Sequence, residues 1–351
     1  MKKISLLLLV FAGFGVGSGL RAQDPQFSQF YTIPMYLNPA FAGAAQVPRV
    51  SFLYRNQWPN LQARYNTMAA SFDTYVPKAQ SGIGFVAMRD VQGYAGITTN
   101  EVAAQYAYQF AVKSDIQVRL GLQAAVVQRN AVYAGLSFTS QFDDQGFRGG
   151  ATGEPQDFGN LLYADLGTGG LLFTPQFYVG AALHHLNRPS QSYLGADESE
   201  SALPRRLTLQ AGYKFALDPA TKRGLQRGQN FQEVSFSPAL LYMRQGPFDQ
   251  LNAGFYFTYE PIVVGAWYRG LPIGGYAAGV HNHEAIIGLL GFRSGGITVG
   301  YTYDATISPL TLSTGGAHEI SITYEFISAR DRKRSVIGSG LNGRSLPCPT
   351  F

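Results

Sequence analysis

Histidine and carboxylate side chains whose spacing could do chemistry occur at two places in the sequence. His281 and His283 lie on one face of a predicted strand beside Glu284, and this spacing could chelate a transition metal. No third ligand is evident from the sequence, so a polar strand end at a membrane interface is the better interpretation. His184 and His185 lie where another predicted strand meets a loop, and adjacent strand residues point to opposite faces. We expect no metal site from either pair.

Acidic residues gather in one predicted connection. Asp143, Asp144, Glu154 and Asp157 lie among glycines, as the ligands of calcium loops do. The alternating order of oxygen ligands is missing, so a solvated surface loop is the better interpretation. The nucleophile motif G-x-S-x-G is also missing from the chain. We therefore expect no catalytic residues and no metal or cofactor, with a hydrolase built on one of the histidines as a distant alternative.

The N-terminus has the pattern of a secretory signal peptide. Lys2 and Lys3 precede an apolar run, and cleavage is expected after Ala22. Residues 1–22 hold three of the 27 basic residues and no acidic ones, so the mature chain has 24 basic against 22 acidic side chains. The basic excess lies in the tail, residues 328–351, which we expect to be periplasmic. The charge balance gives no support to nucleic-acid binding.

Most of the mature chain alternates between apolar and polar or small residues, which predicts strands with two different faces. The clearest case is residues 116–126, where isoleucine, valine, leucine and alanine alternate with glutamine, arginine and glycine. Such segments, separated by turn signals, number about 14. They lie near residues 49–57, 65–77, 81–91, 96–112, 115–129, 161–173, 175–186, 203–216, 231–245, 248–259, 262–270, 282–293, 296–305 and 316–327.

These strands predict a transmembrane antiparallel β-barrel, an all-β fold, spanning residues 49–327. No mature segment reaches 18 consecutive apolar residues. Hydrocarbon offers no partners for backbone amides, so strands can cross a membrane only in a closed barrel. A water-soluble β-sandwich also alternates, but it seldom keeps long strands with an apolar face of tyrosine, phenylalanine, leucine and valine along the whole chain.

The lengths of the connections predict which end of the barrel is periplasmic. Long connections at 130–160, 187–202, 271–281 and 306–315 follow odd-numbered strands, and tight turns follow most even-numbered ones, as in barrels with short periplasmic turns. The basic connection 217–230 departs from this rule. It either marks an error in the count or meets a periplasmic partner.

Charged residues within the strands predict a filled interior. An arginine turned to lipid at mid-depth costs roughly 2–4 kcal/mol. Arg55, Asp73, Arg119 and Glu325 are therefore expected to face the lumen, where opposite charges can pair. Such pairs favour a narrow or filled lumen over an open pore.

Residues 23–48, before the first strand, do not alternate cleanly. Their sequence DPQFSQFYTIPMYLNPAFAGA, residues 24–44, resembles the opening motif of the PorP/SprF family of type IX secretion system membrane proteins. The resemblance continues in YRNQW (54–58), SFD (71–73), GGAHEISITYEF (315–326) and the closing CPTF (348–351). It therefore spans the mature chain.

The resemblance implies an outer-membrane protein of the type IX secretion and gliding machinery. Some family members are linked to the periplasmic ring of that system, and others to the export or surface attachment of large adhesins. The expected partners are therefore outer-membrane lipids and either ring lipoproteins or secreted adhesins. An outer-membrane channel for small or hydrophobic solutes fits the same barrel and is the alternative.

The opening motif has two interpretations. Its aromatic residues could pack inside the barrel as a plug, with Asn38 and Pro39 starting a turn and Gly43 ending the segment. The same segment could instead face the periplasm and bind a partner, and the closing motif could dock there too. The residues expected to form the plug or to bind partners are Asp24, Pro25, Gln26, Phe27, Gln29, Phe30, Tyr31, Asn38, Pro39, Gly43, Cys348, Pro349 and Phe351.

Overall fold

The computed structural model describes residues 23–94, 96–113, 115–132, 136–149, 157–193, 201–218, 233–271, 282–307 and 312–327. The expected signal peptide (1–22) and basic tail (328–351), with Cys348, Pro349 and Phe351, lie outside the described residues, as does most of the connection 217–230. Within the described part, no helix is long and apolar enough to cross a membrane.

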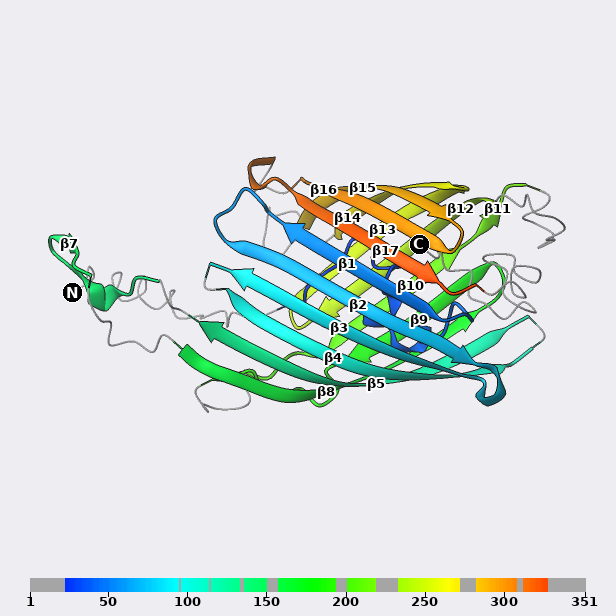
Figure 1. The fold of residues 1–351 in the computed structure, drawn as a ribbon, viewed down its shortest axis with the longest axis horizontal. Coiled ribbons are helices and arrows are strands. Elements are labelled where there is room, and N and C mark those ends of the chain that lie inside the picture. The colour runs from blue at the N-terminus through cyan, green and yellow to red at the C-terminus, as the bar shows by residue number, and fades with distance from the viewer. Residues whose placement is uncertain are drawn as a thin grey trace, which may run out of the picture.

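Fourteen long strands build one closed antiparallel sheet, which confirms the predicted barrel (Figure 1). The strands are β1 (Arg49–Gln57), β2 (Arg64–Val76), β3 (Ser81–Gly93), β4 (Ile97–Ala111), β5 (Gln117–Val132), β8 (Asp157–Phe173), β9 (Phe177–His184), β10 (Arg206–Tyr213), β12 (Val234–Gln245), β13 (Phe248–Tyr259), β14 (Ile262–Leu271), β15 (Asn282–Ser294), β16 (Ile297–Thr306) and β17 (Ala317–Glu325). Each lies within a few residues of its predicted position.

Smaller elements complete the described chain. They are the short strands β6 (Phe142–Asp143), β7 (Gly146–Phe147) and β11 (Phe215–Ala216), and the 3-10 turns η1 (Pro34–Tyr36), η2 (Pro39–Phe41), η3 (Pro77–Ala79), η4 (Thr139–Gln141) and η5 (Leu312–Thr314). β11 continues the line of β10 after a break at Lys214, whose side chain forms an ion pair with Glu233. The predicted single strand 203–216 is therefore two pieces.

Two pairings close the barrel. β1 pairs with β17 along its whole length, so the first and last strands of the chain lie side by side. β10 pairs with both β9 and β12. Each of the fourteen long strands thus pairs with a neighbour on both sides, as a closed wall in hydrocarbon requires.

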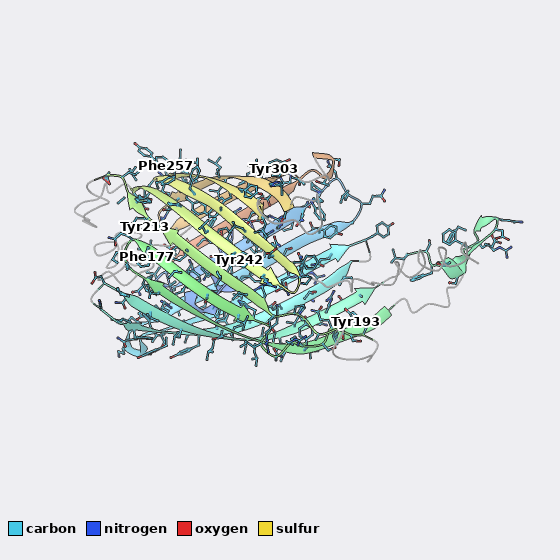
Figure 2. All side chains as sticks on the ribbon, turned by 180° about the vertical axis from the view of Figure 1, so that it is seen from behind. Phe177, Tyr193, Tyr213, Tyr242, Phe257 and Tyr303 are labelled. Atoms are coloured by element: carbon cyan, nitrogen blue, oxygen red, sulfur yellow. The ribbon has the colours of Figure 1, made fainter. Side chains whose placement is uncertain are left out.

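The two faces of the wall differ as the alternation predicted. Outward side chains are apolar, and Phe52, Leu122 and Ile320 keep 46%, 63% and 50% of their surface exposed. Figure 2 shows aromatic side chains over the outside of the wall toward both ends, with Phe177 and Tyr213 near one end. Inward side chains are mainly polar or small, and they are buried. This arrangement suits a lipid-facing exterior.

The barrel has two unlike ends. β5, β9, β14 and β16 all end, and the long strands that follow them begin, at the same end of the barrel, which we call the loop end (left in Figure 1). Tight connections such as η3 between β2 and β3 meet at the opposite, turn end. β11 ends and β12 begins at the turn end as well. The rule of short periplasmic turns predicts that the turn end is periplasmic.

Candidate functional site

Residues 23–48 run through the lumen from the loop end to the turn end. The backbone nitrogen of Asp24 donates to Gln245 at the loop end of β12, and that of Gly43 donates to Asp73 near the turn end of β2. Between these points most side chains are buried, and Met35 has no exposed surface. We call residues 23–48 the plug. It occupies the barrel interior as a plug-like segment, in line with the predicted fold.

Glycines in the wall allow the turn-end half of the plug to touch the backbone of the strands. A Cβ on Gly82 would lie 1.8 Å from the carbonyl oxygen of Ala42, and one on Gly121 would lie 2.2 Å from the nitrogen of Ala40. A Cβ on Gly169 would lie 2.1 Å from Oδ1 of Asn38. Any side chain at these three positions would displace the plug, so the wall and the plug fit by shape.

Arg119 holds the same half by hydrogen bonds. Its side chain, from β5, has no exposed surface. Nε donates to the carbonyl of Ala40 at 2.9 Å, Nη1 donates to that of Gly43 at 3.4 Å, and Nη2 donates to that of Ala42. The guanidinium therefore gathers the carbonyls at the end of η2. We expected Arg119 to face the lumen and pair with an opposite charge, but its contacts are mainly plug carbonyls.

Asn38 begins η2 and also joins the plug to the wall. Its Oδ1 accepts from the nitrogen of Ala40 at 2.9 Å, as in an N-cap. Its Nδ2 donates to the carbonyls of Gly170 in β8 and Ala181 in β9, at 3.1 and 3.2 Å. Pro39 is the first residue of the turn. One amide thus satisfies three backbone groups on three segments.

Aromatic contacts pack the middle of the plug. The rings of Phe27 and Tyr36 meet edge to face at 5.2 Å, within the plug. Phe30 meets Trp267 of β14 at 4.9 Å, and Tyr31 meets Tyr256 of β13 at 4.8 Å, both edge to face. The hydroxyl of Tyr36 donates to the carbonyl of Pro25 at 2.6 Å, which folds the plug back on itself.

A carboxylate of the wall holds the plug nearer the loop end. Both oxygens of Glu319 accept from consecutive plug backbone nitrogens, those of Ser28 at 2.6 Å and Gln29 at 2.8 Å. Arg55 donates to Glu319 at 2.5 Å and to Asp304 at 2.9 Å. Two backbone donors and one guanidinium thus satisfy a carboxylate that has no exposed surface.

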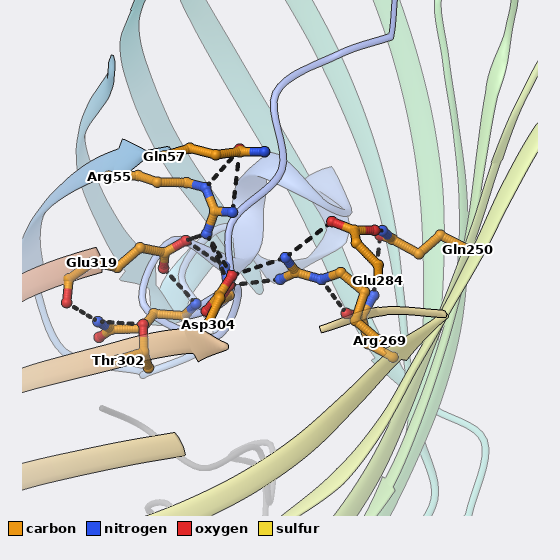
Figure 3. Close-up of polar contacts among 11 residues, drawn as sticks. Arg55, Gln57, Gln250, Arg269, Glu284, Thr302, Asp304 and Glu319 are labelled. Carbon is orange, nitrogen blue, oxygen red and sulfur yellow. Dashed lines mark hydrogen bonds and ion pairs between the residues drawn. The ribbon is translucent and has the colours of Figure 1, made fainter. Parts of the chain in front are cut away.

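Arg269 completes this group from the opposite side (Figure 3). It donates to Asp304 at 3.0 Å and to the hydroxyl of Ser28 at 2.6 Å. The two buried arginines therefore balance the two buried acids, Glu319 and Asp304, with Ser28 among them. Glu284, which is 40% exposed, forms a further ion pair with Arg269 at 3.6 Å. We call Ser28, Arg55, Arg269, Asp304 and Glu319 the charge cluster. Buried ions persist only when paired in this way.

A second charged group holds the N-terminal end of the plug. Asp24 accepts from Arg206 at 2.7 Å and contacts Nε2 of His185 at 2.8 Å, while Asp165 contacts Nδ1 at 2.9 Å. Burial lowers the pKa of His185, but the carboxylates of Asp24 and Asp165 outweigh it and raise this pKa to about 9. Burial likewise raises the pKa of Asp24, but His185 and Arg206 hold it well below its usual range. His185 is therefore protonated, and positively charged, at neutral pH.

The expectation that His184 and His185 point to opposite faces was wrong. Both rings lie inside, because His185 follows the end of β9 in a left-handed conformation, with φ +56°. His184 contacts the carbonyl of Leu37, and His185 takes the contacts described above. A residue in a turn no longer follows the alternation of the strand before it.

A hollow of about 480 Å³ lies at the loop end, above the charge cluster. We call it the vestibule. Its floor is residues 23–26, the first residues of the plug, and its wall includes Gln57, Trp58 and Tyr65. The rings of Trp58 and Tyr65 meet at 5.1 Å. The vestibule therefore offers aromatic and amide side chains together at the mouth of the barrel.

The metal and calcium candidates have other contacts. Nδ1 of His283 lies 2.5 Å from the hydroxyl of Tyr268, while His281 lies outside the described residues. Asp143 forms an ion pair with Arg148 on the hairpin of β6 and β7, and Glu154 is not described. Among the residues that the structure does describe, no three histidines, cysteines or acids cluster as metal ligands would.

Sequence reasoning missed five charged residues of the wall that hold the plug, Asp165 through His185 and the others directly: Asp165, Arg206, Arg269, Asp304 and Glu319. Each faces the lumen from a strand. Their shared signal is a charge at an inward position of an alternating segment, which had singled out Arg55 and Asp73. Their partners are up to 291 residues away along the chain, so the pairings had no local signal.

Comparison with known proteins identifies a family. The model of the family described as "Type IX secretion system membrane protein PorP/SprF" matches residues 20–324. No curated protein matches the chain. Among solved structures, the Ralstonia pickettii toluene transporter TbuX is 13% identical, with 84% of this chain and 94% of that chain covered and a TM-score of 0.42. A triple mutant of the Rhodopseudomonas blastica porin is 8% identical, with 80% and 99% covered and a TM-score of 0.33.

Proposed function

Because this chain belongs to the PorP/SprF family of type IX secretion system membrane proteins, we propose that it is a non-enzymatic component that recognises protein partners in the outer membrane. The filled lumen is the observation that carries the proposal. Buried aromatic rings, wall glycines and Arg119 hold the plug along the barrel axis. A barrel filled in this way is suited to recognition at its two ends rather than to conduction of solutes.

The vestibule is the surface that we propose for secreted cargo. It lies at the loop end, which faces outward if short turns are periplasmic. Trp58 and Tyr65 offer rings, and Gln57 and Gln26 offer amides that both donate and accept hydrogen bonds. Aromatic and amide groups of this kind suit a polypeptide partner. A surface adhesin held by this barrel would meet the vestibule first, whereas ring lipoproteins would meet the turn end.

Site-specific crosslinking in intact cells tests this assignment. A photoreactive amino acid replaces Gln57 in the vestibule in one variant, and the exposed Lys78 in η3 at the turn end in a matched control. We expect mass spectrometry to recover a large secreted protein from the first position and ring lipoproteins from the second. Ring lipoproteins crosslinked at Gln57 would overturn the assignment of the vestibule to cargo.

Conductance measurements test the proposal against a solute channel. The purified full-length protein is expected to give no stable conductance in planar bilayers, while deletion of residues 27–44 opens the lumen and gives a large one. Solute-dependent conductance by the intact protein, without any protein partner recovered from cells, would replace the recognition function with that of a channel.

A further inference from the structure

An apolar hollow lies on the lipid-facing side of the wall. It has a volume of about 660 Å³ and spans β5, β8, β9, β10 and β12, with an edge on β13. Three small outward residues on adjacent strands, Gly170, Ala181 and Ala211, form its floor. Leu172, Val179, Leu209 and Leu240 stand around them, each between 37% and 51% exposed.

The strand register explains why the wall is hollow here. Gly170 pairs with Ala181, and Ala181 pairs with Leu209 on its other side. In the next outward row Leu172 pairs with Val179, and Val179 pairs with Ala211. The small side chains thus form a diagonal groove between rows of larger ones, because outward positions on paired strands lie side by side.

The hollow lies opposite a contact of the plug. Asn38, inside the barrel, donates its amide to the carbonyls of Gly170 and Ala181, which are the floor of the hollow outside. At this seam between β8 and β9 the wall is one backbone thick, with no large side chain between the plug and the lipid. Whatever fills the hollow therefore packs against the backbone that anchors Asn38.

The position of the hollow selects its occupant. Leu172 and Val179 lie a few residues from the turn between β8 and β9, so strand rise places the hollow about 10–15 Å from the turn end, within that leaflet. The exposed Lys113 lies in the neighbouring turn between β4 and β5, below the groove. A phosphate beside this lysine and a hydrocarbon chain in the groove would complement both parts.

We propose that the hollow binds one acyl chain of a phospholipid from the turn-end leaflet, with the phosphate of that lipid near Lys113. A saturated chain of 16 carbons occupies roughly 450 Å³, at about 27 Å³ for each methylene, which fits the available volume. The chain covers the thin seam between β8 and β9. This site is independent of the proposed role in secretion, because it needs only the barrel and a membrane.

Native mass spectrometry of the full-length protein tests the site. The wild type is expected to keep one phospholipid after detergent washing, and Ala181→Leu or Ala211→Leu, which fills the groove, to lose at least nine-tenths of it. Ala87→Leu is the matched control, because Ala87 is an exposed outward alanine on β3, away from the hollow. Lys113→Gln is expected to reduce retention several-fold.

A quenching experiment keeps the test independent of groove-filling variants. Tryptophan replaces Leu240 at the rim of the hollow, or Leu290 on the distant lipid face of β15. Phospholipid brominated on its acyl chain, present as a minor component of the vesicle, is expected to quench Leu240→Trp several-fold more than Leu290→Trp. Equal quenching at both positions, or equal lipid retention by Ala181→Leu and Ala87→Leu, would overturn the proposal.

Discussion

The two halves of the plug are held by different physical means. The turn-end half, around Asn38 to Gly43, meets glycines of the wall and one guanidinium that binds backbone carbonyls. The loop-end half, around Asp24 to Gln29, meets the charge cluster and the imidazolium of His185. Shape holds one half, and balanced charge holds the other.

This difference separates a fixed part of the plug from a part that responds to conditions. The close contacts between the plug backbone and the glycines of the wall involve no group that titrates, so they change little with pH or salt. Buried ion pairs depend on the protonation of each member, and loss of one member leaves the other uncompensated. We therefore expect the turn-end half to be the permanent seal and the loop-end half, which carries the vestibule floor, to be the adjustable part.

The largest effect is expected when a side chain is added at a wall glycine that contacts the plug. Gly121→Val places atoms where the nitrogen of Ala40 lies, so the turn-end half cannot seat, at a cost of more than about 4 kcal/mol. Planar bilayer conductance should rise from none to a stable open level. Gly288→Val is the matched control, because a Cβ there meets nothing within 4 Å. A sealed, folded Gly121→Val protein would show that shape does not hold this half.

Removal of the Arg119 guanidinium is expected to have the second-largest effect. Arg119→Met leaves the carbonyls of Ala40, Ala42 and Gly43 without their donor and should lower the free energy of unfolding by about 3–5 kcal/mol. The midpoint of urea unfolding measures this loss. Arg119→Lys keeps the charge but not the forked geometry, so it should recover only part of the stability. Full recovery by lysine would mean that charge alone matters here.

Loss of one acid from the charge cluster should have a smaller effect. Glu319→Gln turns an acceptor into a donor opposite the nitrogen of Ser28 or Gln29 and removes a partner of Arg55, at a cost of about 2–3 kcal/mol. Urea unfolding measures this loss as well. Glu325→Gln, at the turn end of the same strand, is the control. If both variants unfolded at the same urea concentration, the charge cluster would contribute nothing to the plug.

The smallest effect is a local response to pH at His185. Its pKa is raised from 6.5 to about 9, so its stabilisation of Asp24 is fully present below pH 6.5 and is lost as pH rises through 9. A nitroxide on Gln26→Cys, with Cys348→Ser to remove the other thiol, should gain mobility over that range. His185→Gln should abolish the pH dependence. If the mobility of the nitroxide did not change with pH in the wild type, the charge of His185 would not hold the loop-end half of the plug.

The barrel was readable from the sequence because alternation is a local property. Residues 116–126 alone show both faces of β5, and all fourteen strands followed from such segments. Arg55 and Asp73 were placed in the lumen because a charged side chain in lipid is destabilising, by roughly 2–4 kcal/mol for an arginine and by less for an acid. The break at Lys214 was missed, because its ion-pair partner Glu233 has no signal in the local pattern.

The site was less readable, because the plug follows no period. Asn38 and Pro39 indicated a turn, but neither indicated that Gly82, Gly121 and Gly169 would receive it. A glycine in a strand is compatible with a bulge, a bend or a close approach, and only the third dimension distinguishes them. His185, which has a left-handed backbone conformation, was likewise misplaced, because side chains alternate between two faces only inside strands.

The course of the plug also constrains how the molecule can be assembled. The segment enters β1 at the turn end, yet its beginning lies at the loop end, so about 20 residues lie inside a ring whose last seam joins β1 to β17. Threading that segment through a finished ring would require bulky aromatic residues to pass Arg119 and the charge cluster. This passage is avoided if the wall folds around the segment and β1 pairs with β17 last. The plug then acts as a template for the folding of the barrel before it closes the lumen.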